Sequence, residues 1–279
     1  MKRAGVIGWP VAHSLSPVLH GYWLEELGIA GSYEKIPAAP EEFKTAIVRL
    51  REQGFGGVNV TVPHKEAAFA LANDNDAAAR MAGATNLLVF HDDHIEGRNT
   101  DSYGLMASLR EQIGMLAGGT AVLLGAGGAA RGVLIALDQL GAGTIHLLNR
   151  DPKRAESLAA ALAPRLNAKI APAALTQWKH AAEGAALLVN STSAGMGGNP
   201  PLDLDLSALP QAAAVCDIVY HPLETQLLKD AKARGHAAID GLGMLMHQAA
   251  PSFEAFFGAW PEVSQGLRDR LVQELNSRG

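Results

Sequence analysis

The stretch TAVLLGAGGAARGVLIALDQL, residues 120–140, places a compact apolar run directly before a glycine-rich turn and a helical pattern directly after it. Residues 125–130, GAGGAA, fit the pattern G-x-G-x-x-G/A. In this pattern the glycines allow a tight turn and let a pyrophosphate approach the backbone at the N-terminus of the following helix. The glycines alone are a weak signal, but the strand before them and the helix after them predict a dinucleotide-binding unit. A glycine turn with only a structural role is the alternative.

The rest of the chain also alternates strand-like apolar runs with helical patterns, which is typical of an α/β protein with largely parallel sheets. Strands are expected at residues 5–8, 33–37, 57–62, 86–90, 94–100, 120–124, 144–150, 186–190 and 214–219. Helices are expected at residues 16–27, 41–53, 66–81 in two pieces, from the glycine turn to 140, at 151–163 and over most of the last 40 residues.

Composition indicates a globular protein of one large or two ordinary domains, with 279 residues of which 48% are hydrophobic and 18% charged. Acidic residues outnumber basic ones by 28 to 23 and no Lys/Arg run occurs, so neither nucleic acid nor an anionic membrane is an expected partner. The chain has a single cysteine, Cys216, which lies in an apolar run. A single cysteine excludes an internal disulfide and fits a reducing cytoplasm. No segment is long enough to span a membrane, and no metal is expected.

A second informative stretch is NVTVPHK, residues 59–65. Strand geometry sends Val58, Val60 and Val62 to one face and Asn59 and Thr61 to the other, before Pro63 stops the ladder and Lys65 follows. An edge strand with a solvated face is the structural alternative.

Other polar side chains fall near expected strand ends, where ligands bind in open α/β sheets. They are Ser14 and Ser16 in HSLSP, Asn86 in GATN, and Asn99, Thr100 and Asp101 before a helix. Each has a structural alternative. Ser16 and Asp101 could be helix N-caps, Asn86 a turn residue, and Gln248 a solvated helix position.

These motifs resemble the shikimate dehydrogenase family in order and spacing over essentially the whole chain. The motifs are HSLSP, NVTVPHK, GATN, NTD, GAGGAAR, NR, NSTSAGM, Tyr220 before Pro222, and DGLGMLMHQA. The resemblance implies reversible NADPH-dependent reduction of 3-dehydroshikimate to shikimate in the chorismate route to aromatic amino acids. It also implies a substrate domain formed by residues 1–102 and 240–279, a Rossmann domain formed by 103–239 that binds NADP, and an active site in the cleft between them.

Site residues follow from the same resemblance, position by position. It makes Lys65 and Asp101 catalytic. Substrate contacts would be Ser14, Ser16, Asn59, Thr61, Asn86, Tyr220 and Gln248. Cofactor contacts would be Gly125, Ala126, Gly127, Gly128, Ala129, Asn149, Arg150, Arg154, Thr192, Met196, Gly241 and Met244.

Cofactor choice depends on the end of the strand TIHLL. NAD-binding Rossmann units usually place an acidic residue about 20 positions beyond the first glycine, to hold the ribose 2′-hydroxyl. Here Asn149 and Arg150 follow the strand, and Arg150 with Arg154 can bind the 2′-phosphate of NADP. Asp151 argues for NAD, but Asp151 before Pro152 also fits a helix N-cap.

Two other functions stay open. A quinate/shikimate dehydrogenase that uses NAD or both cofactors would share the fold, and a non-catalytic ligand-sensing protein of this architecture is a remote alternative. Ser14 with Ser16 resembles the shikimate pattern, and a sensor would be expected to have lost the pair Lys65 and Asp101. A small-molecule substrate and a monomer or homodimer are expected.

Overall fold

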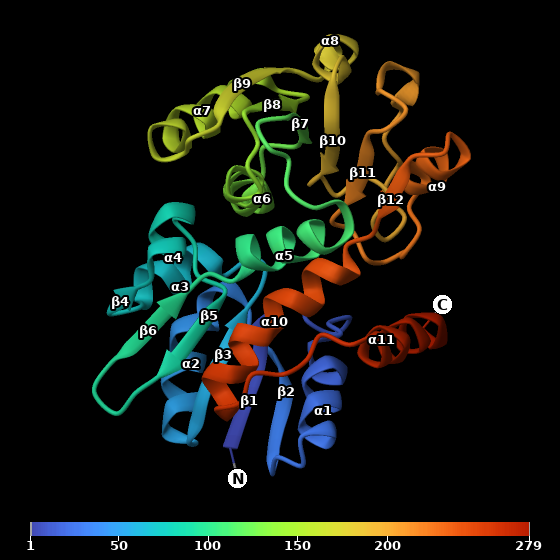
Figure 1. Cartoon of the computed structure of the whole chain (residues 1–279). Helices are drawn as coiled ribbons and strands as arrows, with labels where there is room; N and C mark the ends of the chain where they lie inside the picture. Colours follow the sequence, from blue (N-terminus) through green and yellow to red (C-terminus); the bar gives the residue numbers. More distant parts are fainter. Residues whose placement is uncertain (1, 279) are drawn as a thin grey trace. The chain divides into compact units, whose positions relative to one another are not determined.

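The computed structural model describes residues 2–278, which form two compact units with mixed α/β structure (Figure 1). The first unit holds the residues up to Asp101 together with those from Met246 onward, and the second unit is Ser102–Leu245. The expectation of an α/β protein with a Rossmann unit in the middle of the chain is confirmed.

The first unit is built on a six-stranded mixed sheet in the order β2-β1-β3-β5-β6-β4. Its strands are β1 (Lys2–Gly8), β2 (Gly31–Pro37), β3 (Phe55–Val60), β4 (Asp74–Asn75), β5 (Leu87–Phe90) and β6 (Ile95–Arg98). Its helices are α1 (Ser16–Glu26), α2 (Phe43–Glu52) after a 3-10 turn, α3 (Lys65–Leu71), α4 (Ala77–Ala82) and α11 (Gln265–Ser277). The helix α10 (Leu242–Phe257) runs along the chain from the second unit into the first.

The strand β3 is central in this sheet, so the edge-strand interpretation of NVTVPHK is wrong. It pairs with β1 in parallel and with β5 in antiparallel orientation. Since β5 is also antiparallel to β6, the strands β1, β3 and β6 all run in the same direction. The carboxyl ends of these three strands therefore lie at one edge of the sheet.

Two different layers cover the two faces of the first sheet. Val58 and Val60 point to the face covered by α2, where Phe43 and Ile47 are buried. Val62 was expected on the same face, but β3 ends at Val60 and Val62 is exposed. Asn59 points to the opposite face, because successive side chains alternate along a strand. An aromatic layer from β2, α1 and α10 lies on that opposite face, formed by His20, Trp23, Tyr33, Phe253, Phe256 and Phe257.

The second unit is a Rossmann sheet in which all paired strands are parallel, in the order β12-β11-β10-β7-β8-β9. Its strands are β7 (Thr120–Leu124), β8 (Thr144–Asn149), β9 (Lys169–Ala174), β10 (Ala185–Asn190), β11 (Ala214–Asp217) and β12 (Ala237–Ile239). Its helices are α5 (Asp101–Ile113), whose first residue belongs to the first unit, α6 (Gly128–Gln139), α7 (Pro152–Leu162), α8 (Trp178–Ala182) and α9 (Gln226–Ala233).

Sequence patterns missed β4, which has only two residues, as well as β9 and β12. β9 contains Pro172, which cannot donate to a ladder and is tolerated here because β9 is an edge strand. β12 has only three residues. Cys216 lies in β11, between β10 and β12, and is fully buried.

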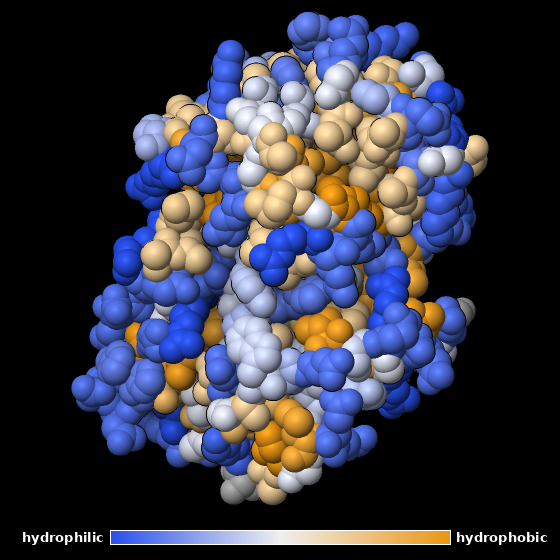
Figure 2. All heavy atoms as spheres, viewed as in Figure 1, coloured by the Kyte–Doolittle hydropathy of each residue, from blue (hydrophilic) through white to orange (hydrophobic). Residues whose placement is uncertain are grey.

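Apolar side chains are mostly inside. The face seen in Figure 2 carries mainly hydrophilic residues, with apolar residues in small separate groups. Among the described residues, no helix is long and apolar enough to cross a membrane.

Two glycines of the first unit provide a matched test of its packing. A Cβ on Gly57 would lie 2.3 Å from the backbone oxygen of Leu88 and 2.7 Å from the Phe256 ring, whereas a Cβ on Gly21 would meet nothing within 4 Å. Gly57→Ala should therefore lower the free energy of unfolding by about 1–3 kcal/mol. Gly21→Ala, inside α1, should raise it by about 0.5–1 kcal/mol. Urea unfolding of both variants measures this, and equal effects would contradict the packing described here.

Candidate active site

Lys65 and Asp101 form an ion pair at the carboxyl edge of the first sheet. Lys65 is the first residue of α3, which follows β3, and Asp101 is the first residue of α5, which follows β6. The Lys65 Nζ lies 2.5 Å from the Asp101 Oδ2, and the side chains are 31% and 18% exposed. Both groups are thus held close together and still reach solvent.

Asn86 fixes the second oxygen of Asp101. Its Nδ2 donates to Asp101 Oδ1 at 2.8 Å and to Thr100 Oγ1 at 3.0 Å, while the backbone N–H of Thr100 donates to Asn86 Oδ1 at 2.9 Å. Gln248 Oε1 lies 3.4 Å from Thr100 Oγ1 and 3.5 Å from Asn86 Nδ2. Asn86 is therefore a buried part of a polar network, and the half-buried Gln248 of α10 joins it.

The two N-cap interpretations are wrong, because Ser16 and Asp101 are each the first residue inside their helix, and α1 has no side-chain cap. At α5, Asn99 Oδ1 accepts from the backbone N–H of Asp101 at 3.0 Å, which leaves the Asp101 carboxylate to Lys65. At α1, which begins at Ser16, Ser14 Oγ accepts from the backbone N–H of Ser16 at 3.3 Å.

Asn59 is buried on the aromatic face of the sheet. Its Nδ2 donates to the backbone oxygen of Asn86 at 3.2 Å and to Ser252 Oγ at 2.8 Å, and its Oδ1 accepts from the Tyr33 hydroxyl at 2.8 Å. Burial raises the pKa of Tyr33 well above its usual range, and a hydrogen bond with Ser16 opposes this shift. Predicted residues Ser16, Asn59 and Asn86 are thereby linked to one another.

Tyr33 and Ser252 were not predicted from the sequence. The available signal for Tyr33 was a tyrosine inside an expected strand, because a buried phenol needs a hydrogen-bond partner. Of the other predicted substrate residues, Thr61 is half-buried just beyond β3, and Tyr220 belongs to the second unit, after β11.

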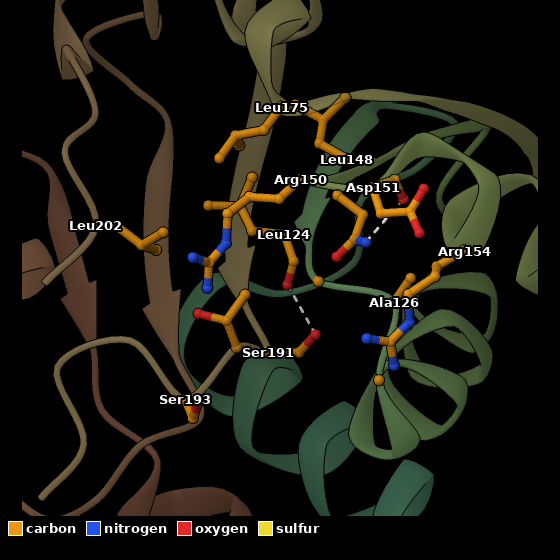
Figure 3. A pocket seen from close by; sticks show the side chains of 14 residues that line it. Leu124, Ala126, Leu148, Arg150, Asp151, Arg154, Leu175, Ser191, Ser193 and Leu202 are labelled. Carbon is orange, nitrogen blue, oxygen red and sulfur yellow. Dashed lines mark hydrogen bonds between the residues drawn. The ribbon is translucent and has the colours of Figure 1, made fainter. Parts of the chain in front are cut away.

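The second unit has a pocket of about 360 Å³ at the carboxyl ends of β7, β8 and β10 (Figure 3). Predicted cofactor residues that line it are Gly125, Ala126, Gly127, Asn149, Arg150, Arg154 and Thr192. Predicted residues outside this lining are Gly128, Ala129, Met196, Gly241 and Met244. Lining residues that were not predicted include Ser191 and Ser193, although NSTSAGM was recognised as a motif.

The glycine turn needs its first glycine for two reasons. Gly125 has φ +100, and a Cβ there would lie 2.9 Å from Thr192 Cγ2 and 3.0 Å from Ser191 Oγ. A Cβ on Gly127, the N-cap residue of α6, would meet nothing within 4 Å. That space above a helix N-terminus suits a pyrophosphate, so the pocket fits a dinucleotide.

Asn190 and Asp217 hold the opposite wall of the pocket. The Asn190 Oδ1 accepts from the backbone N–H and the hydroxyl of Thr192, at 3.0 and 2.8 Å, and its Nδ2 donates to Asp217 Oδ1 at 3.0 Å. Ser191 Oγ donates to the backbone oxygen of Leu124 at 2.8 Å, as Figure 3 shows. The loop after β10 is thereby fixed against β7.

Asp151 caps α7, as predicted. Its Oδ1 accepts from the backbone N–H of Lys153 at 3.1 Å, and Figure 3 shows the carboxylate near the start of α7, away from the Arg150 guanidinium. Arg150 and Arg154 are exposed on separate sides of the pocket (Figure 3), and neither guanidinium bonds to another residue within 2–278. Both are available for an anion.

In residues 2–278 no group of three His, Cys, Asp or Glu side chains is placed to hold a metal ion. A Rossmann unit joined in one chain to an α/β unit with a paired ammonium and carboxylate defines the class of two-domain dinucleotide-dependent dehydrogenases.

Comparisons with known proteins give the family. Residues 6–88 match the model of a shikimate dehydrogenase substrate binding domain, and residues 108–196 match that of shikimate / quinate 5-dehydrogenase. A shikimate dehydrogenase (NADP(+)) of Methylobacterium radiotolerans is 52% identical over 98% of this chain and 97% of its own length. The chain belongs to the shikimate dehydrogenase family, which confirms the resemblance.

Solved structures show the same fold. Shikimate 5-dehydrogenase from Thermus thermophilus in complex with NADP(H) and shikimate has a TM-score of 0.87 and 36% identity, covering 98% of this chain and 99% of that one. Quinate dehydrogenase from Corynebacterium glutamicum in complex with NAD has a TM-score of 0.89 and 30% identity, covering 98% and 99%. The fold is thus shared by enzymes that differ in substrate and cofactor.

His20 lies directly against Tyr33 in the aromatic layer. The two rings stack with centroids 3.9 Å apart and planes at 4°. Neither ring nitrogen has a hydrogen-bond partner among the described residues, and burial lowers the pKa of His20 to about 3. The imidazole is therefore neutral in the folded protein.

This buried imidazole predicts a loss of stability in mild acid. In the unfolded chain His20 takes up a proton below about pH 6.5, whereas in the folded protein it does not until about pH 3. Protons therefore favour unfolding, and the His20 contribution falls by about 2 kcal/mol between pH 7 and pH 5. Tyr33, the other titratable group in the layer, stays neutral over this range.

Urea unfolding at pH 7 and pH 5 measures the effect. The variant His20→Phe keeps an aromatic ring but cannot titrate, so its loss between the two pH values should be smaller than that of wild type by about 2 kcal/mol. An equal loss in both proteins would show that His20 does not carry the pH dependence.

Proposed function

We propose that this protein catalyses the reversible NADPH-dependent reduction of 3-dehydroshikimate to shikimate. The observation that carries this proposal is the Lys65–Asp101 pair at the carboxyl edge of the first sheet, within a network of amides and hydroxyls. A polyhydroxylated acid needs such short hydrogen-bonding partners, and a carbonyl under reduction needs a proton donor. The non-catalytic sensor is disfavoured because the pair is present.

Lys65 acts as the general acid. When bound, the cofactor supplies a hydride to the substrate carbonyl. The Lys65 ammonium donates a proton to the developing alkoxide and stabilises its negative charge. Asp101 keeps the ammonium in place through its Oδ2, and Asn86 holds Asp101 through its Oδ1. In the reverse direction the neutral amine accepts the proton of the shikimate hydroxyl.

The first unit is proposed to bind the substrate. Ser14 and Ser16 would contact its carboxylate, since both follow β1, whose carboxyl end lies at the same edge of the sheet as that of β3. The hydroxyls and the reacting oxygen would be contacted by Asn59, Thr61, Asn86, Asp101 and Gln248. Tyr220 of the second unit stays a predicted substrate contact.

The second unit is proposed to bind NADPH, with its pyrophosphate at the N-terminus of α6 and its 2′-phosphate between Arg150 and Arg154. Asp151 supports NADP, because its carboxylate is used at the α7 N-terminus. Gly128, Ala129, Met196, Gly241 and Met244 remain predicted contacts. For Gly241 there is also a structural reason, since a Cβ there would lie 2.1 Å from the backbone oxygen of Ile218.

We place the protein in the cytoplasm, as a monomer or homodimer. The only cysteine is buried and unpaired, as expected in a reducing compartment. Sedimentation of the purified protein would decide between the two oligomeric states.

Initial rates with shikimate and quinate, each with NADP and NAD, test the function directly. Fast oxidation of shikimate with NADP is expected. Faster oxidation of quinate with NAD would establish the quinate/shikimate alternative instead, and absence of turnover with all four pairs would favour the sensor.

Lys65→Ala is expected to lower kcat by about 100-fold or more, because a general acid is lost, while the KM for shikimate changes much less. Asp101→Asn keeps the shape of the side chain but removes its charge. The kcat of this variant should also fall, while its Tm stays close to that of wild type. The control Lys44→Ala removes an exposed lysine from α2 and should leave kcat unchanged. A Lys65→Ala variant with most of its kcat would make Lys65 a bystander.

Arg150→Ala should reduce the preference for NADP over NAD. We expect wild type to prefer NADP at least about tenfold in kcat/KM, equivalent to about 1.4 kcal/mol. The control Lys153→Ala removes the same charge from α7 outside the pocket lining and should preserve the preference. If wild type used NAD equally well, or if Asp151→Ala abolished an NAD activity, Asp151 would be a ribose ligand.

A further inference from the structure

The side-chain amide of Asn59 has no donor left for a ligand. An amide nitrogen carries two N–H groups. In Asn59 one donates to the backbone oxygen of Asn86 and the other to Ser252 Oγ. Its Oδ1 has two lone pairs, of which the Tyr33 hydroxyl occupies one. A second lone pair on Oδ1 is the only remaining hydrogen-bonding capacity of this side chain.

This orientation of the amide is fixed by its partners. The backbone oxygen of Asn86 can only accept, so the nitrogen of Asn59 must face it. A reversed amide would place two oxygens against each other inside a buried site. Tyr33 must consequently donate to Asn59 and cannot accept from it.

We propose that Tyr33 and Ser252 are positioning residues that make Asn59 a hydrogen-bond acceptor only, so that its place in the substrate site takes a ring hydroxyl and rejects a carboxylate or carbonyl. The proposal rests on the proposed function and deepens it. Tyr33 acts from β2 and Ser252 from α10, and neither needs to touch the substrate.

The packing around Tyr33 suits this role. Its ring is stacked on His20 at 3.9 Å, which fixes the plane of the phenol and the direction of its hydroxyl. Burial raises the pKa of Tyr33, so the hydroxyl keeps its proton and stays a donor.

Asn86 has the same polarity, by independent contacts. Its two N–H groups donate to Thr100 Oγ1 and Asp101 Oδ1, and its Oδ1 accepts from the backbone N–H of Thr100. The Thr100 Oγ1 also lies 3.4 Å from Asn86 Oδ1, so the Asn86 amide, like that of Asn59, has no free donor to offer a ligand. Acceptor groups of the substrate must be bound elsewhere, and Lys65, which has three N–H groups and donates to Asp101, is a donor available for them.

Tyr33→Phe and Ser252→Ala each remove one oxygen that holds Asn59. We expect the KM for shikimate to rise about tenfold in each, with kcat within about threefold of wild type and the KM for NADP unchanged. The control Tyr22→Phe also deletes a phenol oxygen, but this one lies in α1 and makes only an exposed hydrogen bond to Glu26. The KM of this variant for shikimate should not change. Because the two variants act from different elements, Ser252→Ala tests the proposal if Tyr33→Phe does not fold.

Shikimate analogues that each lack one non-reacting ring hydroxyl separate positioning from general stability. With wild type, the analogue that lacks the hydroxyl bound by Asn59 should have a kcat/KM about tenfold below that of shikimate, because Asn59 Oδ1 loses its donor. With Tyr33→Phe that loss should shrink to about threefold or less, since the acceptor is no longer held. Equal losses in both proteins would overturn the proposal.

Outcomes for this proposal and for the proposed function are distinguishable. If wild type does not oxidise shikimate, the proposed function fails and this proposal fails with it. If wild type oxidises shikimate but both variants keep its KM, the proposal alone is overturned. A fall in kcat with unchanged KM would likewise contradict a positioning role in substrate binding.

Discussion

The close approach of the Lys65 ammonium and the Asp101 carboxylate requires two strands far apart in sequence to end at the same edge of one sheet. β3 and β6 run in the same direction only because β5 lies antiparallel between them. Each then leads into a helix whose first residue is one member of the pair. The hairpin of β5 and β6 is therefore what brings an acid and a base from sequence positions 36 residues apart to 2.5 Å.

The charge arrangement in the second unit differs from that of the Lys65–Asp101 pair. There the ligand is expected to bring the negative charge, and the protein contributes a helix N-terminus and two guanidinium groups without internal partners in the described chain. The one acidic side chain at the pocket, that of Asp151, is occupied by the start of α7. We expect this local capping role of Asp151 to favour NADP over NAD.

Sequence patterns predicted the features that depend on short-range regularity. The glycine turn, the alternation of strands and helices, and the Asp151–Pro152 cap each need only neighbouring residues to be recognised. Strand patterns also brought out the polar residues near strand ends, and the motif resemblance gave Lys65 and Asp101 their catalytic roles. It missed Tyr33 and Ser252, because their importance comes from meeting Asn59 across 26 and 193 positions of sequence. Ser16 and Asp101 were open to a capping interpretation because each lies at the boundary of a helix, where a one-residue shift separates the N-cap position from the first helical residue.

The burial of Cys216 in β11, next to the edge strand of the Rossmann sheet, has a practical consequence. Burial raises the pKa of its thiol, and the carboxylates of Asp217 and Asp240 add to this effect, so the reactive thiolate is scarce while β11 stays in place. As the chain has no other cysteine, a thiol-specific label can attach only when this sheet opens. The rate at which such a label reacts with Cys216 therefore reports how often the nucleotide-binding unit opens, and no engineered probe is required.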